Sequence, residues 1–202
     1  MSKFSLKDHQ FMQRAISLAK RGHFTTSPNP RVGCVIVKNG EIVGEGFHKK
    51  AGQAHAEVYA LKQAGTDAKG ATAYVTLEPC SHFGLTPPCA EALIKAQVSH
   101  VIAAMVDPDP RVSGRGLERL SEAGITTQFG LLEQDARALN TGFIQLMTTK
   151  FPYVRCKLAA SLDGKTAMAS GESQWITSSE ARGDVQRLRA QSCGIICRAD
   201  AV

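Results

Sequence analysis

One histidine and two cysteines constrain the fold of this chain more than any other feature of its sequence. The tripeptide H-A-E at 55–57 is followed by E-P-C at 78–80 and, after eight further residues, by Cys89. An imidazole and two thiolates suit Zn²⁺, and three protein ligands leave the fourth tetrahedral position open. Any fold that uses these side chains together must bring three separate segments to one point.

Each candidate ligand stands beside an expected element. His55 opens a helical stretch that ends at Gly65, Cys89 opens a second helix, and Cys80 follows the strand-like segment ATAYVTL. Helix N-termini favour a thiolate over a thiol. Glu57 is too close to His55 along the chain to share its direction as a ligand, but it is well placed to exchange a proton with a metal-bound water. This arrangement indicates catalysis.

Helices and strands alternate over the first three quarters of the 202 residues. A capped helix over 5–21 is followed by a hairpin around Asn39-Gly40, and alternation continues to a long helix over 131–149. Pro152 then breaks the pattern. We therefore expect one α/β domain over residues 1–149 and a boundary near residue 150.

Residues 150–202 contain a strand-like stretch over 154–164, a helix around SSEARGDVQRLRAQ and an apolar ending. A segment of this size is too short to bury a core of its own. We expect it to be the opening of a further domain whose remainder is absent.

Composition sets the broad class. With 24 basic and 18 acidic residues the formal charge is +6, which favours an anionic partner such as a phosphorylated metabolite or RNA. No apolar run approaches 18 residues and the N-terminus has no secretory signal, so we expect a cytoplasmic protein without a membrane partner. In a reducing compartment, six cysteines suggest metal or redox work for some and packing for others.

The pattern H-A-E…P-C-x₈-C is similar to the H-x-E…P-C-x-x-C signature of zinc nucleobase deaminases, with a longer second spacing. A structural zinc site is the first alternative, although such sites normally have four ligands and need no adjacent carboxylate. Three chemical classes stay open at this point: a pyrimidine deaminase, a tRNA adenosine deaminase, and a non-catalytic zinc module that binds nucleic acid. The spacing disfavours the second, and the 6% of aromatic residues disfavours the third.

Longer segments carry a specific resemblance. TTSPNPRVGCVIVKNGEIVGEGFH, AHAEVYAL, AYVTLEPCSHFGLTPPC and DPDPRVSGRG resemble, in order and spacing, the deaminase part of the bifunctional deaminase/reductase family of riboflavin biosynthesis. FPYVRCKLAASLDGKTAMASGESQWITSSEAR resembles the start of that family's reductase. The resemblance implies a cytidine-deaminase-like α/β/α three-layer sandwich with a mixed sheet, followed by the start of a dihydrofolate-reductase-like α/β domain.

The resemblance also implies residue roles in the deaminase. Zinc would be held by His55, Cys80 and Cys89, and Glu57 would transfer protons. The substrate would be 2,5-diamino-6-ribosylamino-4(3H)-pyrimidinone 5′-phosphate, a small molecule rather than a nucleic acid, and a homo-oligomer is possible. The positions that match substrate contacts are Asn29 and His48. The alternatives are local turn capping for Asn29 and an exposed surface histidine for His48.

In the reductase segment the resemblance makes Ala159 and Trp175 contacts of NADPH, and Ser173 and Arg189 contacts of substrate. The 202 residues contain no glycine-rich phosphate loop. We therefore expect no complete NADPH site and no reductase activity in this chain.

Two positions depart from the family pattern. Leu85 stands where the family often has a basic residue that grips the substrate phosphate, and Asp109 stands where it often has asparagine. Both changes weaken an anion site. Arg111, Arg115 or the lysines 49 and 50 could compensate.

The remaining candidates are less informative. His82 could support a metal ligand through a hydrogen bond. We expect Cys34 and Cys156 to serve packing, and we interpret the spacing of Cys193 and Cys197 as incidental because no further ligand stands nearby.

Overall fold

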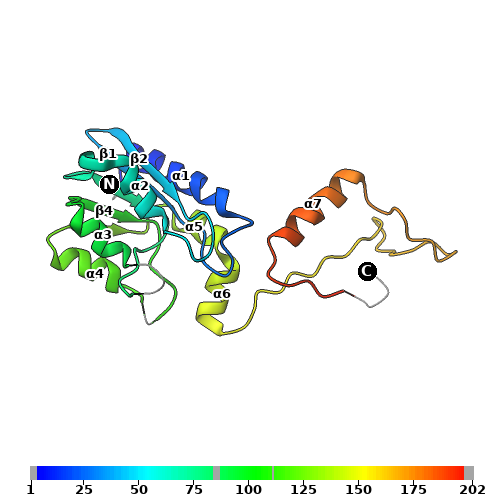
Figure 1. Ribbon diagram of the computed structural model, residues 1–202. Helices are drawn as coiled ribbons and strands as arrows, with labels where there is room; N and C mark the ends of the chain where they lie inside the picture. The colour runs from blue at the N-terminus through cyan, green and yellow to red at the C-terminus, as the bar shows by residue number, and fades with distance from the viewer. Residues whose placement is uncertain (1–3, 84–86, 111, 198–202) are drawn as a thin grey trace. The chain divides into compact units, whose positions relative to one another are not determined.

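The computed structural model describes residues 4–83, 87–110 and 112–197. The chain divides into two compact units, Met1–Tyr153 and Val154–Val202 (Figure 1). The first unit contains all five strands and both hydrophobic clusters found in the described part of the chain.

The first unit is built on a five-stranded sheet in the order β2-β1-β3-β4-β5. Its strands are β1 (Gly33–Lys38), β2 (Glu41–Phe47), β3 (Thr72–Val75), β4 (His100–Ala103) and β5 (Thr126–Phe129). The β1 strand pairs antiparallel with both β2 and β3, whereas β3, β4 and β5 run parallel. The expected mixed sheet is therefore confirmed.

The hairpin between β1 and β2 turns at Asn39-Gly40, as predicted. Both residues have positive φ, 53° for Asn39 and 82° for Gly40, which is the backbone of a type I′ turn. This turn fixes the register in which Lys38 faces Glu41. The pairing shifts between Val37 and Ile36, and at the far end of the hairpin Gly33 faces Phe47, directly before His48.

Helices cover both faces of the sheet. In the first unit the helices are α1 (Leu6–Ala19), α2 (Ala56–Ala64), α3 (Cys89–Lys95), α4 (Arg115–Glu122), α5 (Glu133–Leu139) and α6 (Thr141–Thr149), with short 3₁₀ turns at Lys20–Gly22 and Gly65–Ala68. The predicted capping box begins α1: Ser5 and Asp8 each hydrogen-bond the other's backbone N–H.

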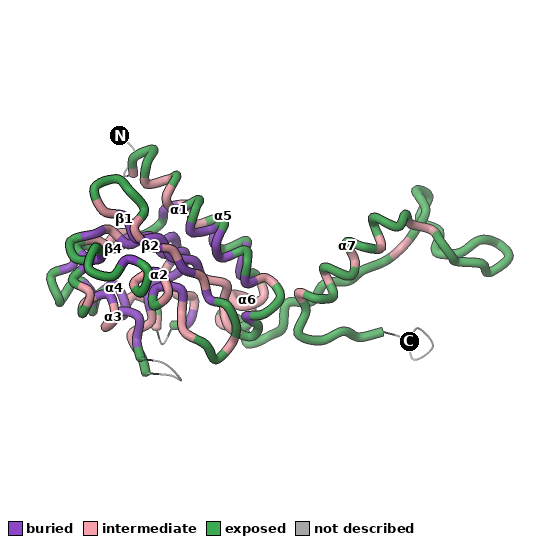
Figure 2. The backbone as a smooth tube through the Cα atoms, turned by 45° about the horizontal axis from the view of Figure 1, so that its top comes forward, coloured by how far each residue is buried: buried purple, intermediate pink, exposed green. Residues whose placement is uncertain are grey.

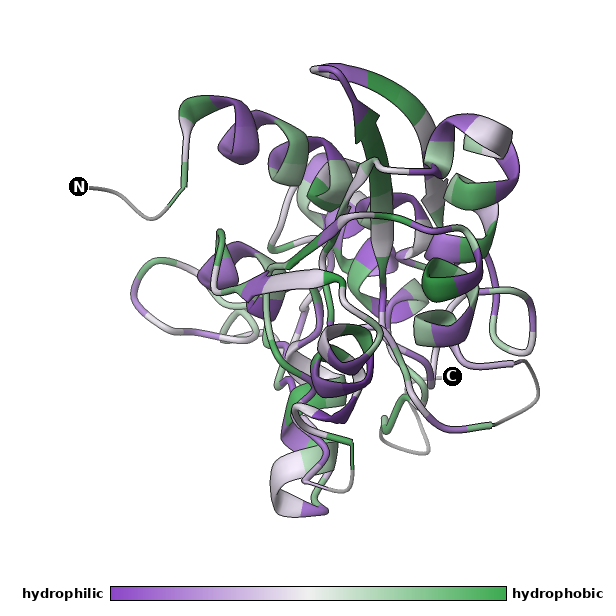
Figure 3. Cartoon of the chain, turned by 90° about the vertical axis from the view of Figure 1, so that its left-hand side faces the viewer, coloured by the Kyte–Doolittle hydropathy of each residue, from purple (hydrophilic) through white to green (hydrophobic). Residues whose placement is uncertain are grey.

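Side chains that alternate along the strands form two separate cores. Val35, Tyr74 and Ile102 face α1 and α5, whereas Ile36, Val75 and Val101 face α2, α3 and α4 (Figure 1). In Figure 3 hydrophobic and hydrophilic positions alternate along the helices, as expected for helices that pack one side against a sheet. The unit is the expected three-layer α/β/α sandwich.

The single helix predicted over 131–149 is wrong, because the structure ends α5 at Leu139 and begins α6 at Thr141. Asn140 between them has φ −125° and is buried. Its Oδ1 atom accepts the Arg31 backbone N–H at 2.8 Å, and its Nδ2 atom donates to the Arg31 carbonyl at 2.9 Å. A tertiary contact thus overrides helix propensity at this residue.

Within residues 154–197, the described part of the second unit, one helix forms, α7 (Ser179–Ala190), which is capped by Ser178. The strand predicted over 154–164 is wrong, since no strand forms between residues 154 and 197. A β-strand needs a neighbouring strand to receive its backbone hydrogen bonds. No residue between 154 and 197 is buried, as the green and pink tube of this segment in Figure 2 shows. Across the described ranges, no helix is long and apolar enough to span a bilayer.

Candidate zinc centre and substrate cavity

Three candidate metal ligands, one imidazole and two thiols, meet at one corner of the first unit. The Nδ1 atom of His55 lies 3.1 Å from Sγ of Cys89 and 3.6 Å from Sγ of Cys80. One potential ligand atom from each residue lies within 4.8 Å of the other two. The structure therefore brings together the three residues that the sequence predicts as metal ligands.

Local structure explains the convergence. His55 is the N-cap residue of α2 and Cys89 is the first residue of α3, while Cys80 lies on the segment after β3. The backbone N–H of Cys89 donates to Sγ of Cys80 at 3.3 Å. The start of α2 approaches β2 closely at Gly46, where an added Cβ would lie 2.2 Å from the carbonyl oxygen of Ala56.

The charges at this corner favour a cation. The pKa of the Cys80 thiol is lowered to about 4, chiefly because the Cys89 thiol donates to it, and His55 lowers it further. The pKa of Cys89 is raised, because its proton is shared with Cys80 and because it is buried. A hydrogen bond to Cys80 raises the pKa of His55. One nitrogen and two sulfurs that compete for protons form a set suited to zinc.

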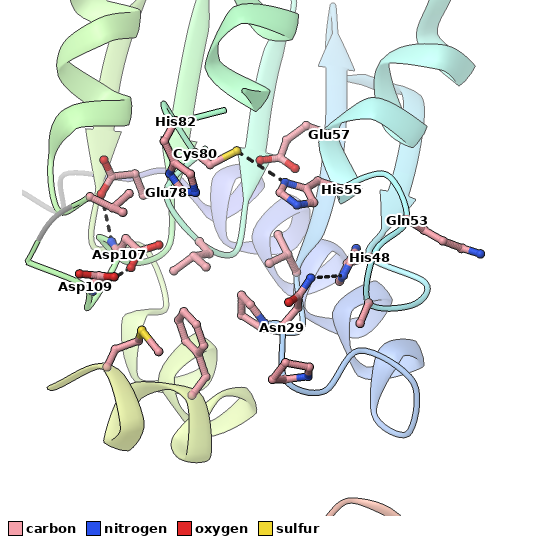
Figure 4. Close-up of a pocket in the computed structure, with 18 of the residues that line it drawn as sticks. Asn29, His48, Gln53, His55, Glu57, Glu78, Cys80, His82, Asp107 and Asp109 are labelled. Carbon is pink, nitrogen blue, oxygen red and sulfur yellow. Dashed lines mark hydrogen bonds between the residues drawn. The ribbon is translucent and has the colours of Figure 1, made fainter. Parts of the chain in front are cut away.

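Glu57 lies beside the ligands and is 3% exposed. Burial raises its pKa to about 7, and the nearby Cys80 adds to the effect. Its Oε2 atom is buried and has no hydrogen-bond partner. In Figure 4 the Glu57 carboxyl group faces Cys80 across the corner where His55 also lies. Buried carboxyl oxygens normally have a hydrogen-bond partner. The unpaired Oε2 atom of Glu57 therefore indicates a site that binds a further polar group between Glu57, His55 and Cys80.

A cavity of about 540 Å³ opens beside this corner. Polar side chains gather in three places on its wall: His55, Glu57 and Cys80 at the metal corner, Asn29 and His48 at a second place, and Glu78, His82, Asp107 and Asp109 at a third, while Gln53 lies apart from them (Figure 4). Apolar side chains complete it, among them Val112, Phe143 and Met147. The described residues that line it include neither lysine nor arginine.

Asn29 and His48 contact each other in the cavity wall. The Nδ2 atom of Asn29 lies 3.3 Å from Nε2 of His48, and Nδ1 of His48 lies 3.1 Å from the carbonyl oxygen of Ala54. Burial lowers the pKa of His48, which favours a neutral ring that donates from Nδ1 and accepts from Asn29. His48 is 2% exposed, so the alternative of a surface histidine is wrong.

The third place in the cavity wall is acidic, and it includes Asp109, one of the two residues that depart from the family pattern. Asp109 is 6% exposed, and its N–H donates to Oδ1 of Asp107 at 2.8 Å. Burial raises the pKa of Asp107. Leu85 and Arg111 lie outside the described residues. Lys49 stands over the ring of Tyr59, 4.4 Å from its centre.

Of the predicted reductase positions, Ser173, Trp175 and Arg189 are exposed and Ala159 is half-buried. The guanidinium carbon of Arg182 lies 4.3 Å from the centre of the Trp175 ring. Cys34 is buried in β1, in agreement with the packing role expected for it. Cys156, Cys193 and Cys197 are exposed, so the packing role expected for Cys156 is wrong within this chain.

Sequence reasoning missed Glu78, Asn140 and Gly46. All three act through backbone groups of distant segments: Glu78 accepts N–H groups from beyond residue 106, Asn140 pairs with Arg31, and Gly46 admits α2. The position of Glu78 next to Pro79 and Cys80 was the only available signal.

A mixed sheet between helical layers, with a His/Cys/Cys corner next to a buried glutamate, defines a zinc-binding domain of the cytidine deaminase type. Residues 5–105 match the family described as the cytidine and deoxycytidylate deaminase zinc-binding region, and residues 152–202 match the RibD C-terminal domain. The chain belongs to the RibD family of riboflavin biosynthesis proteins.

Curated relatives agree over nearly the whole chain. The riboflavin biosynthesis protein RibD of Escherichia coli K12 is 64% identical over 191 residues, which are 95% of this chain and 52% of the relative. RibD of Aquifex aeolicus is 50% identical over 94% of this chain and 53% of its own length. The chain thus spans about half the length of the curated relatives it matches.

Solved structures agree as well. Acinetobacter baumannii RibD has a TM-score of 0.89 at 62% identity and covers 92% of this chain and 52% of its own. A diaminohydroxyphosphoribosylaminopyrimidine deaminase/5-amino-6-(5-phosphoribosylamino)uracil reductase of Thermotoga maritima has a TM-score of 0.85 at 44% identity, over 91% of this chain and 53% of its own. A tRNA:A34 deaminase structure, at 23% identity and a TM-score of 0.51, shares the fold alone.

Proposed function

We propose that this chain catalyses the zinc-dependent hydrolytic deamination of 2,5-diamino-6-ribosylamino-4(3H)-pyrimidinone 5′-phosphate. In this proposal residues 1–149 form the deaminase domain, and residues 150–202 belong to a reductase domain. The observation that carries it is one cavity whose wall contains His55, Cys80, the buried Glu57 and the Asn29–His48 pair, with Cys89 in contact with His55 and Cys80 behind that wall. The name of the Thermotoga maritima relative, a diaminohydroxyphosphoribosylaminopyrimidine deaminase, supports the choice of substrate.

His55, Cys80 and Cys89 would hold the zinc ion. When bound, zinc lowers the pKa of water and so supplies a nucleophile at neutral pH. The net reaction adds water to the ring carbon that carries the exocyclic amine. The carbon–nitrogen bond then breaks, ammonia leaves, and the ring carbon keeps the oxygen as a carbonyl.

Glu57 performs the proton transfers in this reaction. Its pKa of about 7 lies where a carboxyl group can both accept and donate a proton near neutral pH. Its Oε2 atom, which has no protein partner, takes a proton from the attacking water and delivers it to the leaving amine. A buried carboxyl group is suited to this work because bulk water does not compete for its proton.

Asn29 and His48 orient the substrate. The hydrogen bond from the His48 Nδ1–H to Ala54 and the bond from the Asn29 amide to His48 fix both side chains before substrate arrives. Fixed amide and imidazole groups can read the edge of a planar ring without paying an ordering cost on binding. The cavity volume of about 540 Å³ suits a single small nucleotide-like molecule.

The family's reductase uses NADPH, and Ala159, Trp175, Ser173 and Arg189 match its cofactor and substrate positions. We propose that the 202-residue chain does not catalyse this reduction. Residues 154–197 contain no strand and no buried residue, and a cofactor site requires rigid walls.

The test is ammonia release by the zinc-loaded chain from three compounds: the phosphorylated pyrimidine, the same compound without phosphate, and a tRNA. We expect turnover of the phosphorylated pyrimidine and none of the tRNA. Release of ammonia from tRNA alone would replace the proposal with RNA editing, and no release from any of the three would refute it. The compound without phosphate reports how far the phosphate contributes in a chain with Leu85 and Asp109.

A further inference from the structure

Two buried glutamates stand in the cavity wall, and their surroundings differ. Glu57 has an oxygen without a partner, whereas both oxygens of Glu78 are occupied. Glu78 is 3% exposed and lies two residues before Cys80. Burying a carboxylate is costly unless hydrogen bonds compensate it, so the donors around Glu78 identify what it does.

Those donors are four backbone N–H groups from one segment. The Oε2 atom of Glu78 accepts from Asp107 and from Gly114, each at 3.0 Å. The Oε1 atom accepts from Gly116 at 2.7 Å and from Leu117 at 3.4 Å. Glu78 therefore binds a segment made of the described residues 107–110 and 112–117, which we call the wall loop, at its beginning and at its end.

The end that Glu78 binds is the N-terminus of α4. The N-cap residue of this helix, Gly114, has no side chain to satisfy the first N–H groups, and Glu78 supplies the missing acceptor from another part of the chain. A negative charge at this position is also favoured by the helix dipole. At Gly116 an added Cβ would lie 1.9 Å from the Pro79 carbonyl oxygen, so the contact leaves no space between the two segments.

Between these ends the wall loop is held by its own hydrogen bonds. The N–H groups of Val112 and Ser113 both donate to the Asp109 carbonyl at 2.9 Å, and Asp109 donates to Asp107. Because Val112 and Ser113 are hydrogen-bonded to Asp109, and Asp109 to Asp107, holding the two ends of the loop also holds these residues. Asp107, Asp109 and Val112 of this loop line the substrate cavity.

We infer that Glu78 is a positioning residue for substrate binding: its carboxylate holds the wall loop, and with it one wall of the cavity, at a set distance from the Cys80 segment (Figure 4). This inference rests on the proposed function for its substrate. Glu78 does not transfer protons, because both oxygens are committed to backbone N–H groups. The sequence E-P-C thus combines a loop anchor with a metal ligand.

The test compares Glu78→Gln with Glu78→Asp and with the control Glu91→Gln. A glutamine amide would point its NH₂ group at two N–H donors, whereas aspartate keeps the charge on a shorter side chain. Glu91 is a half-buried residue of α3 whose carboxylate pairs with Arg119 of α4 at 2.8 Å, so its variant also removes a carboxylate that contacts α4, but outside the cavity.

Four quantities are measured on the 202-residue chain: bound zinc, hydrogen exchange of the wall-loop amides, and the kcat and KM for the phosphorylated pyrimidine. For Glu78→Gln we expect zinc as in the wild type, exchange faster by about tenfold or more, KM higher by about tenfold or more, and kcat within about threefold. Glu78→Asp should fall between it and the wild type, and Glu91→Gln should match the wild type.

Other outcomes overturn the inference. Loss of zinc from Glu78→Gln would assign Glu78 to holding Cys80, and a fall in kcat at unchanged KM would assign it to catalysis. Lower thermal stability of Glu78→Gln with an unchanged KM would show that Glu78 only stabilises the N-terminus of α4. Should Glu78→Gln fail to fold, Glu78→Asp decides: a raised KM supports the inference and an unchanged KM refutes it.

The exchange measurement separates this inference from the proposed function. If the wild type does not release ammonia from the pyrimidine, the proposed function is wrong. The role of Glu78 in holding the wall loop is then tested by the hydrogen exchange of the wall-loop amides alone. Faster exchange in Glu78→Gln would then support the anchor, and unchanged exchange would refute it.

Discussion

The Nδ1 atom of His55 lies 3.1 Å from the Sγ atom of Cys89, although the two residues are 34 positions apart in the chain. The contact exists because two helices begin at these residues and both pack on the same face of one sheet. The first turns of α2 and α3 thereby deliver a nitrogen and a sulfur to a single point beside Cys80.

Replacing a ligand should remove the metal. We expect Cys89→Ser to lower bound zinc to well below one ion per chain, because a hydroxyl group is a far poorer ligand for zinc than a thiolate. Elemental analysis of the purified protein measures this. Cys34→Ala is the matched control, since Cys34 is also buried but lies in β1 outside the ligand set, and it should keep its zinc.

Glu57→Gln should keep zinc and lose deamination. The substitution preserves shape but removes the group that moves protons, and general acid–base catalysis commonly contributes on the order of 10²- to 10⁴-fold. We expect kcat to fall by at least about 10²-fold in an ammonia-release assay at unchanged zinc content. A variant with wild-type kcat would remove Glu57 from the mechanism.

Gly46→Ala should destabilise the protein, because the new Cβ would meet the Ala56 carbonyl oxygen at 2.2 Å and push α2 away from β2. Overpacking of this kind costs about 1–3 kcal/mol of unfolding free energy, and more where backbone atoms clash. Urea denaturation measures the change. The control Gly142→Ala in α6 meets nothing closer than 3.8 Å and should be neutral or slightly stabilising.

Asn140→Ala should also destabilise the protein. It leaves the N–H and the carbonyl group of Arg31 without their side-chain partner, and each unsatisfied buried group costs about 1–3 kcal/mol. We expect a loss of about 2–3 kcal/mol in denaturant unfolding. Thr141→Ala, at the exposed next residue, should change stability by less than about 0.5 kcal/mol. Equal stability of the two variants would contradict the role of Asn140.

The chain should not oxidise NADPH when supplied with the deaminated product. Residues 154–197 have no buried position with which to form a cofactor site. A spectrophotometric assay at 340 nm follows NADPH directly. Sustained turnover would show that this segment forms a working reductase site and would overturn the proposal.

Local sequence signals predicted most of the fold. The Asn39-Gly40 turn and the Ser5–Asp8 capping box follow from short-range chemistry, and the structure confirms both of them. The spacing of His55, Cys80 and Cys89 was likewise readable, because metal chemistry restricts which residue types can serve.

What the sequence did not reveal depends on contacts between distant backbones. The residues around Asn140 do not indicate that its side-chain amide hydrogen-bonds with the backbone of Arg31, 109 positions away, or that α5 ends there. Similarly, the four donors of Glu78 become neighbours only when the sheet has formed. The strand predicted over 154–164 is wrong because a segment of strand-like composition forms a strand only when another strand pairs with it.

X-ray absorption at the zinc K-edge of the purified, zinc-loaded chain reports which atoms coordinate the metal. We expect two sulfur ligands at about 2.3 Å and two nitrogen or oxygen ligands at about 2.0–2.1 Å, one of which exchanges with added small anions. Three or four sulfur ligands, a sphere that no added anion enters, or the lack of bound zinc would contradict this expectation.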